Sequence, residues 1–126
     1  MSVPVGPYSP VIRAGDTVWL SGQLGLADGV LVQGGVKAEV THIFENARGL
    51  LDRVEANLSQ VMKCTVFLTS MDDFAEMNDA YVAEFDASAP GHRPTRSTVG
   101  NVTLARGASV EIEFTAYVGT GKVTIP

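Results

Sequence analysis

The sequence predicts an α+β fold in which two amphipathic helices cover one face of a β-sheet. Two stretches carry apolar residues at three- and four-residue steps, which is the spacing of a helix with one buried face. Other stretches alternate apolar and polar residues, which is typical of half-buried strands. The order is strands, helix, strand, helix and strands again. Because two helices cover only one face of such a sheet, we expect a two-layer sandwich.

The first two predicted elements are a strand over residues 17–23 and a helix over residues 36–55. In the strand, Trp19 and Gln23 are expected on the face opposite the apolar one. Gly49 lies inside the helix at a cost in stability, so we expect it to mark close packing against another backbone. The apolar stripe of the helix consists of Val36, Val40, Ile43, Phe44, Ala47, Leu50, Leu51 and Val54.

A second strand over residues 61–69 and a second helix over residues 73–85 follow. Met62 is expected on the apolar face of this strand, together with Cys64, Val66 and Leu68. Asp72 or Asp73 is the predicted N-cap of the helix, because its carboxylate can accept hydrogen bonds from first-turn amides.

Residues 86–94 hold two prolines and a glycine, which predicts a loop before two final strands at 97–102 and 109–118. The sheet face that the helices leave uncovered then carries three large aromatic side chains. Aromatic residues on such a face predict a buried partner surface, and self-association with closed symmetry provides one. These aromatic residues are Trp19, Phe67 and Tyr117.

Length and composition favour a single domain over residues 1–126. The net charge of -5, without a cluster of Lys or Arg, argues against nucleic acid as a partner. The single cysteine excludes an intrachain disulfide and suits a reducing compartment. The start, Met1-Ser2-Val3-Pro4, lacks the features of a signal peptide, and no apolar run is long enough to span a membrane. We therefore expect a cytoplasmic protein without membrane contact.

Few residues stand out as chemical candidates. No glycine-rich phosphate loop follows a strand and no Cys/His set has ligand spacing, so no metal and no cofactor are expected. His42 is expected on the solvated face of the first helix, between Glu39 and Glu45. His92 is expected to be an exposed loop residue, and Cys64 a buried hydrophobe rather than a nucleophile.

Arg96 and Glu113 remain. The guanidinium of Arg96 offers a planar fork of donors that suits a carboxylate, and Glu113 lies in the middle of a strand on its polar face. The pattern alone favours a simpler interpretation, in which they are a surface arginine and a solvated glutamate.

Several short motifs occur in a fixed order along the chain. They are Gly6-Pro7-Tyr8-Ser9, Ser21-Gly22-Gln23 with Gly25, Gly34-Gly35-Val36, residues 61–68, Asp73-Phe74 with Asn78, Tyr81 and Phe85, Pro94-Thr95-Arg96-Ser97, and Val110-Glu111-Ile112-Glu113. No single motif is decisive. The ordered set resembles the RidA/YjgF family over nearly the whole chain.

The resemblance implies a chorismate-mutase-like fold with a mixed sheet and a homotrimer with a central barrel and active sites at subunit interfaces. It also implies a cofactor-free deaminase that hydrolyses 2-enamine and 2-imine acids, such as 2-aminoacrylate and 2-aminocrotonate, to 2-keto acids and ammonia. By position, Arg96 would bind the substrate carboxylate and Glu113 would position or activate water. The positions that the resemblance assigns to substrate binding are Tyr8, Ser21, Gly22, Asn78 and Thr98.

The chain departs from the family at two places. Many members have Cys or Ala at the position of Thr98, and Leu-Pro-Lys-Gly where this chain has Leu104-Ala105-Arg106-Gly107. Thr98 keeps the backbone amide, so carboxylate binding is expected to survive, whereas the preferred substrate side chain stays open.

Three other functions stay open as alternatives. They are a non-catalytic regulator that binds small carboxylates, an aminoacrylate-handling deaminase of pyrimidine degradation, and an endoribonuclease. Glu113 argues against a protein that only binds carboxylates, because a carboxylate side chain next to an anionic ligand does not help to bind it. The acidic charge and the lack of a His pair argue against RNA cleavage.

Overall fold

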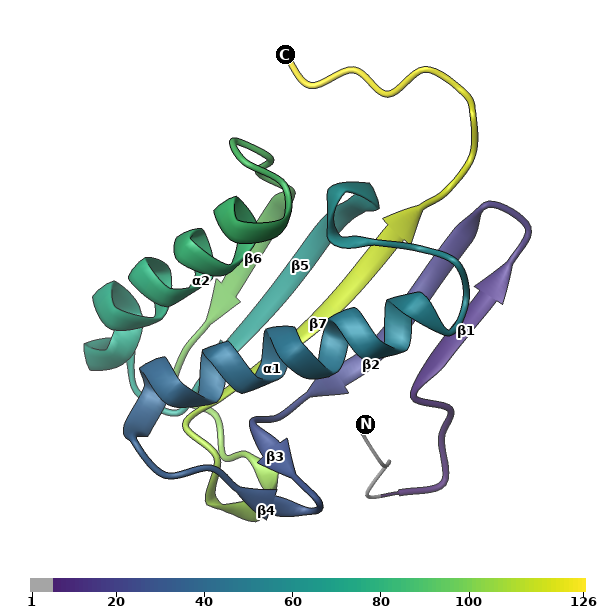
Figure 1. Cartoon of the computed structure of the whole chain (residues 1–126). Coiled ribbons are helices and arrows are strands. Elements are labelled where there is room, and N and C mark those ends of the chain that lie inside the picture. Colours follow the sequence, from purple (N-terminus) through teal and green to yellow (C-terminus); the bar gives the residue numbers. More distant parts are fainter. Residues whose placement is uncertain (1–5) are drawn as a thin grey trace.

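Five strands form one sheet in the computed structural model, which describes residues 6–126 (Figure 1). The tetrapeptide Met1-Ser2-Val3-Pro4, on which the signal-peptide expectation rested, lies outside the described residues. The strand order is β1-β2-β7-β5-β6, and β3 and β4 form a separate hairpin. The strands are β1 (Val11–Ala14), β2 (Thr17–Gln23), β3 (Leu26–Ala27), β4 (Val30–Leu31), β5 (Val61–Leu68), β6 (Thr95–Val99) and β7 (Val110–Tyr117).

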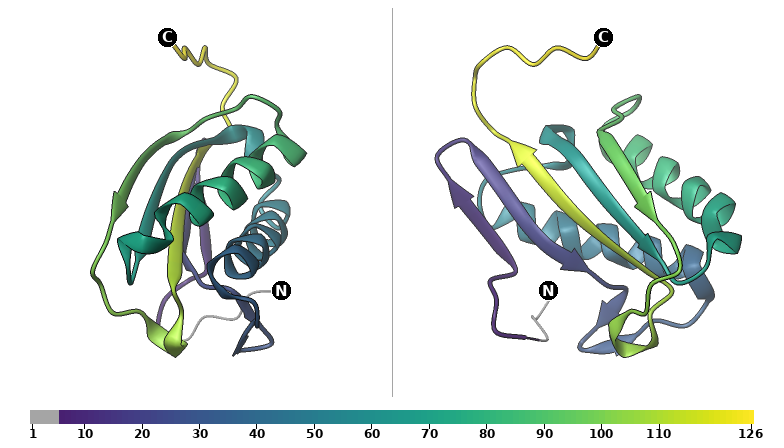
Figure 2. Two further views of the ribbon diagram at one scale, coloured as in Figure 1. Left: turned by 90° about the vertical axis from the view of Figure 1, so that its left-hand side faces the viewer. Right: turned by 180° about the vertical axis from the view of Figure 1, so that it is seen from behind.

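Two helices, α1 (Gly35–Asp52) and α2 (Phe74–Ser88), pack on the same face of this sheet. The side view in Figure 2 shows the two layers, and the view from behind shows the strands with no layer over them. Strands β5 and β6 run parallel, while the other neighbouring strands of the sheet run antiparallel. The predicted α+β sandwich, with a mixed sheet and two helices on one face, is confirmed.

Phe44 of α1 lies at the centre of the core between the layers. Its ring meets Tyr81 and Phe85 of α2 and Phe114 of β7 edge to face, with ring centroids 5.7, 5.1 and 5.5 Å away. Offset and edge-to-face ring pairs are the favoured aromatic geometries. One side chain therefore joins both helices to the sheet.

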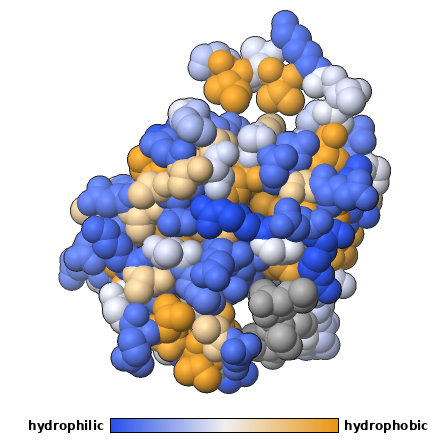
Figure 3. All heavy atoms as spheres, in the orientation of Figure 1, coloured by the Kyte–Doolittle hydropathy of each residue, from blue (hydrophilic) through white to orange (hydrophobic). Residues whose placement is uncertain are grey.

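The uncovered face of the sheet carries large apolar side chains that solvent reaches. Trp19 is 46% exposed, and its neighbour Ile12 on β1 is 51% exposed. Phe67 and Tyr117 are half-buried on the same face, as predicted. The opposite side of the molecule is mainly hydrophilic, with apolar residues gathered at the β3–β4 hairpin and the C-terminal tail (Figure 3).

Two β-bulges change which side chains the sheet buries. Between Leu20 and Gln23 the register of β2 on β7 shifts, so Gln23 pairs with Ile112 and is only 3% exposed. The expectation that Gln23 lies on the uncovered face is therefore wrong. A second shift, at the start of β5, buries Val61 fully and leaves Met62 half-buried. An extra residue in one strand reverses the alternation beyond it.

The bounds of several elements differ from the predictions. Helix α1 ends at Asp52, and α2 continues to Ser88, so part of the predicted loop at 86–94 is helical. Strand β6 begins and ends earlier than the predicted strand at 97–102. Strand β1 and the β3–β4 hairpin were not predicted at all.

The start of α2 is capped differently from the prediction. Asp73 occupies the N-cap position, but its side chain makes no capping hydrogen bond. Instead, the hydroxyl of Ser70 accepts from the backbone N–H of Asp72 at 3.1 Å and caps the short 3-10 turn that leads into the helix. A serine cap one turn earlier satisfies the same class of unpaired amides.

Neither helix of the described chain combines the length and the hydropathy that are needed to cross a membrane.

Cys64 lies in the core, as predicted, and its side chain is fully buried. Burial raises the pKa of its thiol from the ordinary value of 9.0 to about 12. The thiol is therefore neutral at physiological pH, and it cannot serve as a thiolate nucleophile in the folded protein.

We expect the stability that Cys64 contributes to be complete below pH 9 and to be lost as the pH rises towards 12. The unfolded chain releases the thiol proton first, so the free energy of unfolding falls by about 1.4 kcal/mol per pH unit in that range. Urea unfolding at pH 8, 9.5 and 10.5 measures this loss, and Cys64→Ala should show a shallower decline. Equal slopes for both proteins would contradict the assignment.

Candidate functional site

Arg96 lies on the helix-covered side of the edge strand β6, where its backbone pairs with that of Cys64. Its Nη2 donates a hydrogen bond of 2.7 Å to Oδ1 of Asn78 on α2. The guanidinium carbon lies 4.8 Å from the ring centroid of Tyr81 and 5.7 Å from that of Phe74. A cation within about 6 Å of an aromatic centroid is attracted by the ring. One amide and two rings of α2 therefore hold the guanidinium.

The charge of Arg96 has no counter-charge in the described part of the chain. No carboxylate of residues 6–126 lies within ion-pair distance of its guanidinium, which is half-buried. The neighbouring Arg93 differs, because it makes a two-pronged contact with Asp86 and lowers the pKa of that carboxyl. A pocket of about 390 Å³ opens beside Arg96, and it is lined by Asn78, Tyr81, Val82, Arg93, Pro94 and Arg96. A half-buried guanidinium beside open space suits an anionic ligand.

A second group of the predicted residues gathers around strand β2. The hydroxyl of Ser21 donates to the backbone oxygen of Ser9 at 2.6 Å, which ties the segment of Tyr8 to the strand. Tyr8 is 45% exposed. At Gly22 an added Cβ would lie 2.6 Å from Oε2 of Glu111 on β7, so a side chain at position 22 would displace that carboxylate.

Two glutamates of β7 point to the uncovered face, two residues apart. Glu113, the predicted water-positioning residue, is exposed. Glu111 is half-buried, and this burial raises the pKa of its carboxyl, with the nearby charge of Glu113 adding to the effect. A carboxyl with a raised pKa is better suited to proton transfer near neutral pH. Sequence reasoning missed Glu111, because alternation gives both glutamates the same face.

The structure keeps the two groups apart within one chain. Arg96 and Thr98 lie on the covered side of β6, whereas Glu113 and Gly22 belong to the uncovered side of β7 and β2. Strands β7 and β5 separate β2 from β6, which at about 4.8 Å per strand amounts to roughly 14 Å. A single chain therefore does not bring the predicted site residues together around one small molecule.

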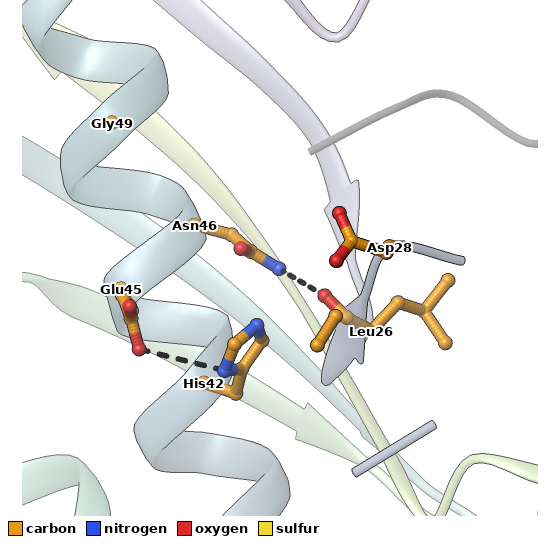
Figure 4. Close-up of a pocket in the computed structure, with 7 residues that line it drawn as sticks. Leu26, Asp28, His42, Glu45, Asn46 and Gly49 are labelled. Atoms are coloured by element: carbon orange, nitrogen blue, oxygen red, sulfur yellow. Dashed lines mark hydrogen bonds and ion pairs between the residues drawn. The ribbon is translucent and has the colours of Figure 1, made fainter. Parts of the chain in front are cut away.

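A different pocket, of about 300 Å³, lies between α1 and the β3–β4 hairpin (Figure 4). None of the predicted site residues lines it. His42 borders this pocket, and its Nδ1 lies 3.4 Å from Oε2 of Glu45. The side chain is half-buried, whereas we expected it on the solvated face of the helix. Asn46 donates to the backbone oxygen of Leu26 at 3.1 Å.

Gly49 of α1 also borders this pocket. A Cβ at Gly49 would meet nothing within 4 Å, so the prediction of close packing against another backbone at Gly49 is wrong.

The remaining singled-out residues have structural contacts. The ring Nε2 of His92 lies 2.6 Å from the backbone oxygen of Val61, so His92 is not the exposed loop residue that we expected. Glu39 is 2% exposed and accepts from the backbone N–H of Ser109 at 2.8 Å. Across residues 6–126, no group of three or more His, Cys, Asp or Glu side chains is arranged to hold a metal ion.

Comparison with known proteins agrees with the motifs. A sequence model of the family described as endoribonuclease L-PSP matches residues 2–118. A RutC family protein of Pyrococcus horikoshii is 35% identical over 116 residues, which cover 90% of this chain and 89% of that protein. The 2-iminobutanoate/2-iminopropanoate deaminase of Mus musculus is 36% identical over 117 residues, covering 91% and 84%.

A solved structure shows the same fold. The crystal structure of RidA from the Antarctic bacterium Psychrobacter sp. superposes with a TM-score of 0.83 at 35% identity, covering 92% of both chains. Family, relatives and fold thus point in one direction. The chain belongs to the family described as endoribonuclease L-PSP, which is the RidA/YjgF family that its motifs resemble.

Proposed function

We propose that this protein hydrolyses reactive 2-enamine and 2-imine acids to 2-keto acids and ammonia, at a site that two copies of the chain build together. The observation that carries the proposal is the guanidinium of Arg96, half-buried beside a pocket and without a counter-charge among residues 6–126. The names of relatives such as the mouse 2-iminobutanoate/2-iminopropanoate deaminase support the reaction class.

The reaction needs little chemical machinery. The imine carbon is already electrophilic, so a positioned water is a sufficient nucleophile. Arg96 binds the substrate carboxylate through a fork of N–H donors and fixes the imine carbon in place. An enamine first becomes the imine by gaining a proton at its terminal carbon and losing one from nitrogen. A glutamate takes a proton from the attacking water and passes it to the imine nitrogen, which gives a carbinolamine. The hydroxyl proton of the carbinolamine then moves to the nitrogen as the carbon–nitrogen bond breaks, which leaves a 2-keto acid and ammonia.

A second copy supplies what one chain lacks. In the proposed homotrimer, Arg96, Asn78 and Thr98 of one copy face Tyr8, Ser21 and Gly22 of its neighbour. The exposed apolar side chains of the uncovered sheet face, such as Trp19 and Ile12, would be buried in the same assembly. This arrangement accounts for two groups that lie on opposite sides of the sheet.

Two glutamates are candidates for taking the proton from the attacking water. Glu113 is the residue that the sequence pattern selects, and it stays a prediction. Glu111 has the stronger physical support, because it is half-buried, its pKa is raised, and its carboxylate lies against Gly22. We therefore propose Glu111 as the proton-transferring carboxylate.

RNA cleavage, which the family description names, has less support here. The net charge of -5 repels a phosphate backbone. The two histidines are also engaged separately, His42 with Glu45 and His92 with a backbone oxygen. Neither faces the other as a general acid and base pair.

We expect the wild-type protein to accelerate keto acid release when a dehydratase generates 2-aminoacrylate or its homologue in the same assay. Arg96→Ala should raise KM at least tenfold, because a charge-assisted hydrogen bond contributes about 1.5–3 kcal/mol and 1.4 kcal/mol is tenfold in binding. Arg96→Lys should fare little better, since an ammonium lacks the planar fork. Arg53→Ala, at an exposed arginine, is the matched control. Full activity in Arg96→Ala would refute the carboxylate clamp.

The two glutamates can be separated by amide substitutions. Glu111→Gln should lower kcat by about 100-fold with a small change in KM, because the amide keeps the shape but cannot accept a proton. Because burial raises the pKa of Glu111, wild-type kcat/KM should fall with decreasing pH at a higher pH than for an ordinary glutamate. Glu113→Gln should lower kcat by a smaller factor. A larger loss of kcat in Glu113→Gln than in Glu111→Gln would favour Glu113 as the residue that acts on the water, as the sequence predicted.

A mixing experiment tests whether two copies share one site. Arg96→Ala and Glu111→Gln chains, each at least tenfold less active alone at substrate concentrations below KM, should regain about a quarter of wild-type activity when they are refolded together. Random mixing joins two intact halves at one interface in four. Light scattering should show trimers in every sample. Mixed trimers that stay inactive would place both residues in one chain's site.

A further inference from the structure

Three residues of α2 form one stripe that faces Arg96. Phe74, Asn78 and Tyr81 follow each other at steps of four and three residues, so they lie above one another on the same helix face. Asn78 accepts one hydrogen bond from the guanidinium, and the rings of Phe74 and Tyr81 lie 5.7 and 4.8 Å from it. Tyr81 is the nearer ring, and only 4% of it is exposed.

The hydroxyl group of Tyr81 does not explain why a tyrosine stands there. It is buried, and its side-chain hydrogen-bonding partner among the described residues is the thiol of Cys64, which is only a weak donor and acceptor. A buried hydroxyl with so weak a partner contributes little to stability. Burial also raises the pKa of this hydroxyl, with Cys64 adding to the effect, so the group stays neutral and does not serve as an acid or base near neutral pH. The useful part of Tyr81 is therefore its ring.

The ring of Tyr81 is held firmly from behind. Phe44 meets it edge to face at 5.7 Å between centroids, and Phe85 lies 4.9 Å away at a tilt. Both partners are fully buried. Tyr81 thus offers a rigid surface on one side, while the pocket beside Arg96 is open on another.

An aromatic ring holds a guanidinium in a way that a carboxylate cannot. A carboxylate would neutralise the charge and occupy the N–H donors that a substrate needs. A ring attracts the cation through its face and leaves those donors free. Among residues 6–126, one of the five N–H groups of Arg96 is used, in the hydrogen bond to Asn78. The remaining donors, with the charge intact, can serve a ligand.

We propose that Tyr81 is a positioning residue for substrate binding, whose ring fixes the guanidinium of Arg96 so that its free N–H donors meet the substrate carboxylate. This inference rests on the proposed function, because it gives Tyr81 a role at the same carboxylate clamp. It assigns the effect to the ring face and not to the hydroxyl.

The test compares Tyr81→Phe with Tyr81→Leu. Phenylalanine keeps the ring, so KM should stay within about twofold of wild type and the melting temperature should not fall. Leucine removes the ring, so KM for the imine and Kd for 2-oxobutanoate should rise about three- to thirtyfold, with kcat changed less. Tyr81→Met repeats the loss with a flexible side chain if the leucine variant does not fold.

Val18→Ala is the control for general damage to the core. Val18 is fully buried on β2, three strands away from the strand of Arg96, and it does not line the pocket beside the guanidinium. We expect Val18→Ala to lower the melting temperature and to leave KM and Kd unchanged. If Val18→Ala raised KM as much as Tyr81→Leu, the positioning role would be overturned.

Two further readouts separate this inference from the proposed function. If Arg96→Ala loses 2-oxobutanoate binding but Tyr81→Leu binds like wild type, the role of Tyr81 is overturned and the proposed function stands. If Arg96→Ala also binds like wild type, the proposed function fails. In that case the NMR signal of the Arg96 Nε–H group tests whether the ring of Tyr81 holds the guanidinium. The ring should shift this signal in wild type and Tyr81→Phe and not in Tyr81→Leu, and an unshifted wild-type signal overturns the inference.

Discussion

Two helices cover only one face of a five-stranded sheet, and the rest of the structure depends on this constraint. On the covered side, Phe44 and its aromatic partners build the core that holds α2 against the sheet. That packing also places Asn78 and Tyr81 over Arg96. On the uncovered side, exposed apolar residues and the carboxylates of β7 are left without a layer of their own. The same constraint thus shapes the core, divides the candidate site and favours a second copy.

The sequence was sufficient for the architecture but not for its irregularities. Alternation located β2, β5 and β7, and helical spacing located α1 and α2, because each of these elements buries a long apolar face. The two bulges were not predicted, because an alternating pattern contains no signal for one extra residue. As a result, Gln23 and Met62 were assigned to the wrong faces of the sheet. Strands β3 and β4 were not predicted, because each has only two residues.

For the candidate site, sequence reasoning named individual residues but could not give their grouping. Arg96 and Asn78 come from a strand and a helix, and only tertiary packing brings them into contact. Alternation could not rank Glu111 above Glu113, because burial differs between them through the contact with Gly22. The distance between the two groups follows from the strand order, in which β7 and β5 stand between β2 and β6.

The position of β1 and β6 at the ends of the sheet has a consequence for solubility. A strand at an open edge exposes unpaired backbone N–H and C=O groups, which can recruit a strand of another molecule and start aggregation. Here the two edge strands have only four and five residues, and the sequence just before β6 contains Pro94. Arg13 places a charge on the other edge strand. Short length, a proline and a charge are features by which sheet proteins discourage unwanted strand addition, so they protect the two open edges of this sheet.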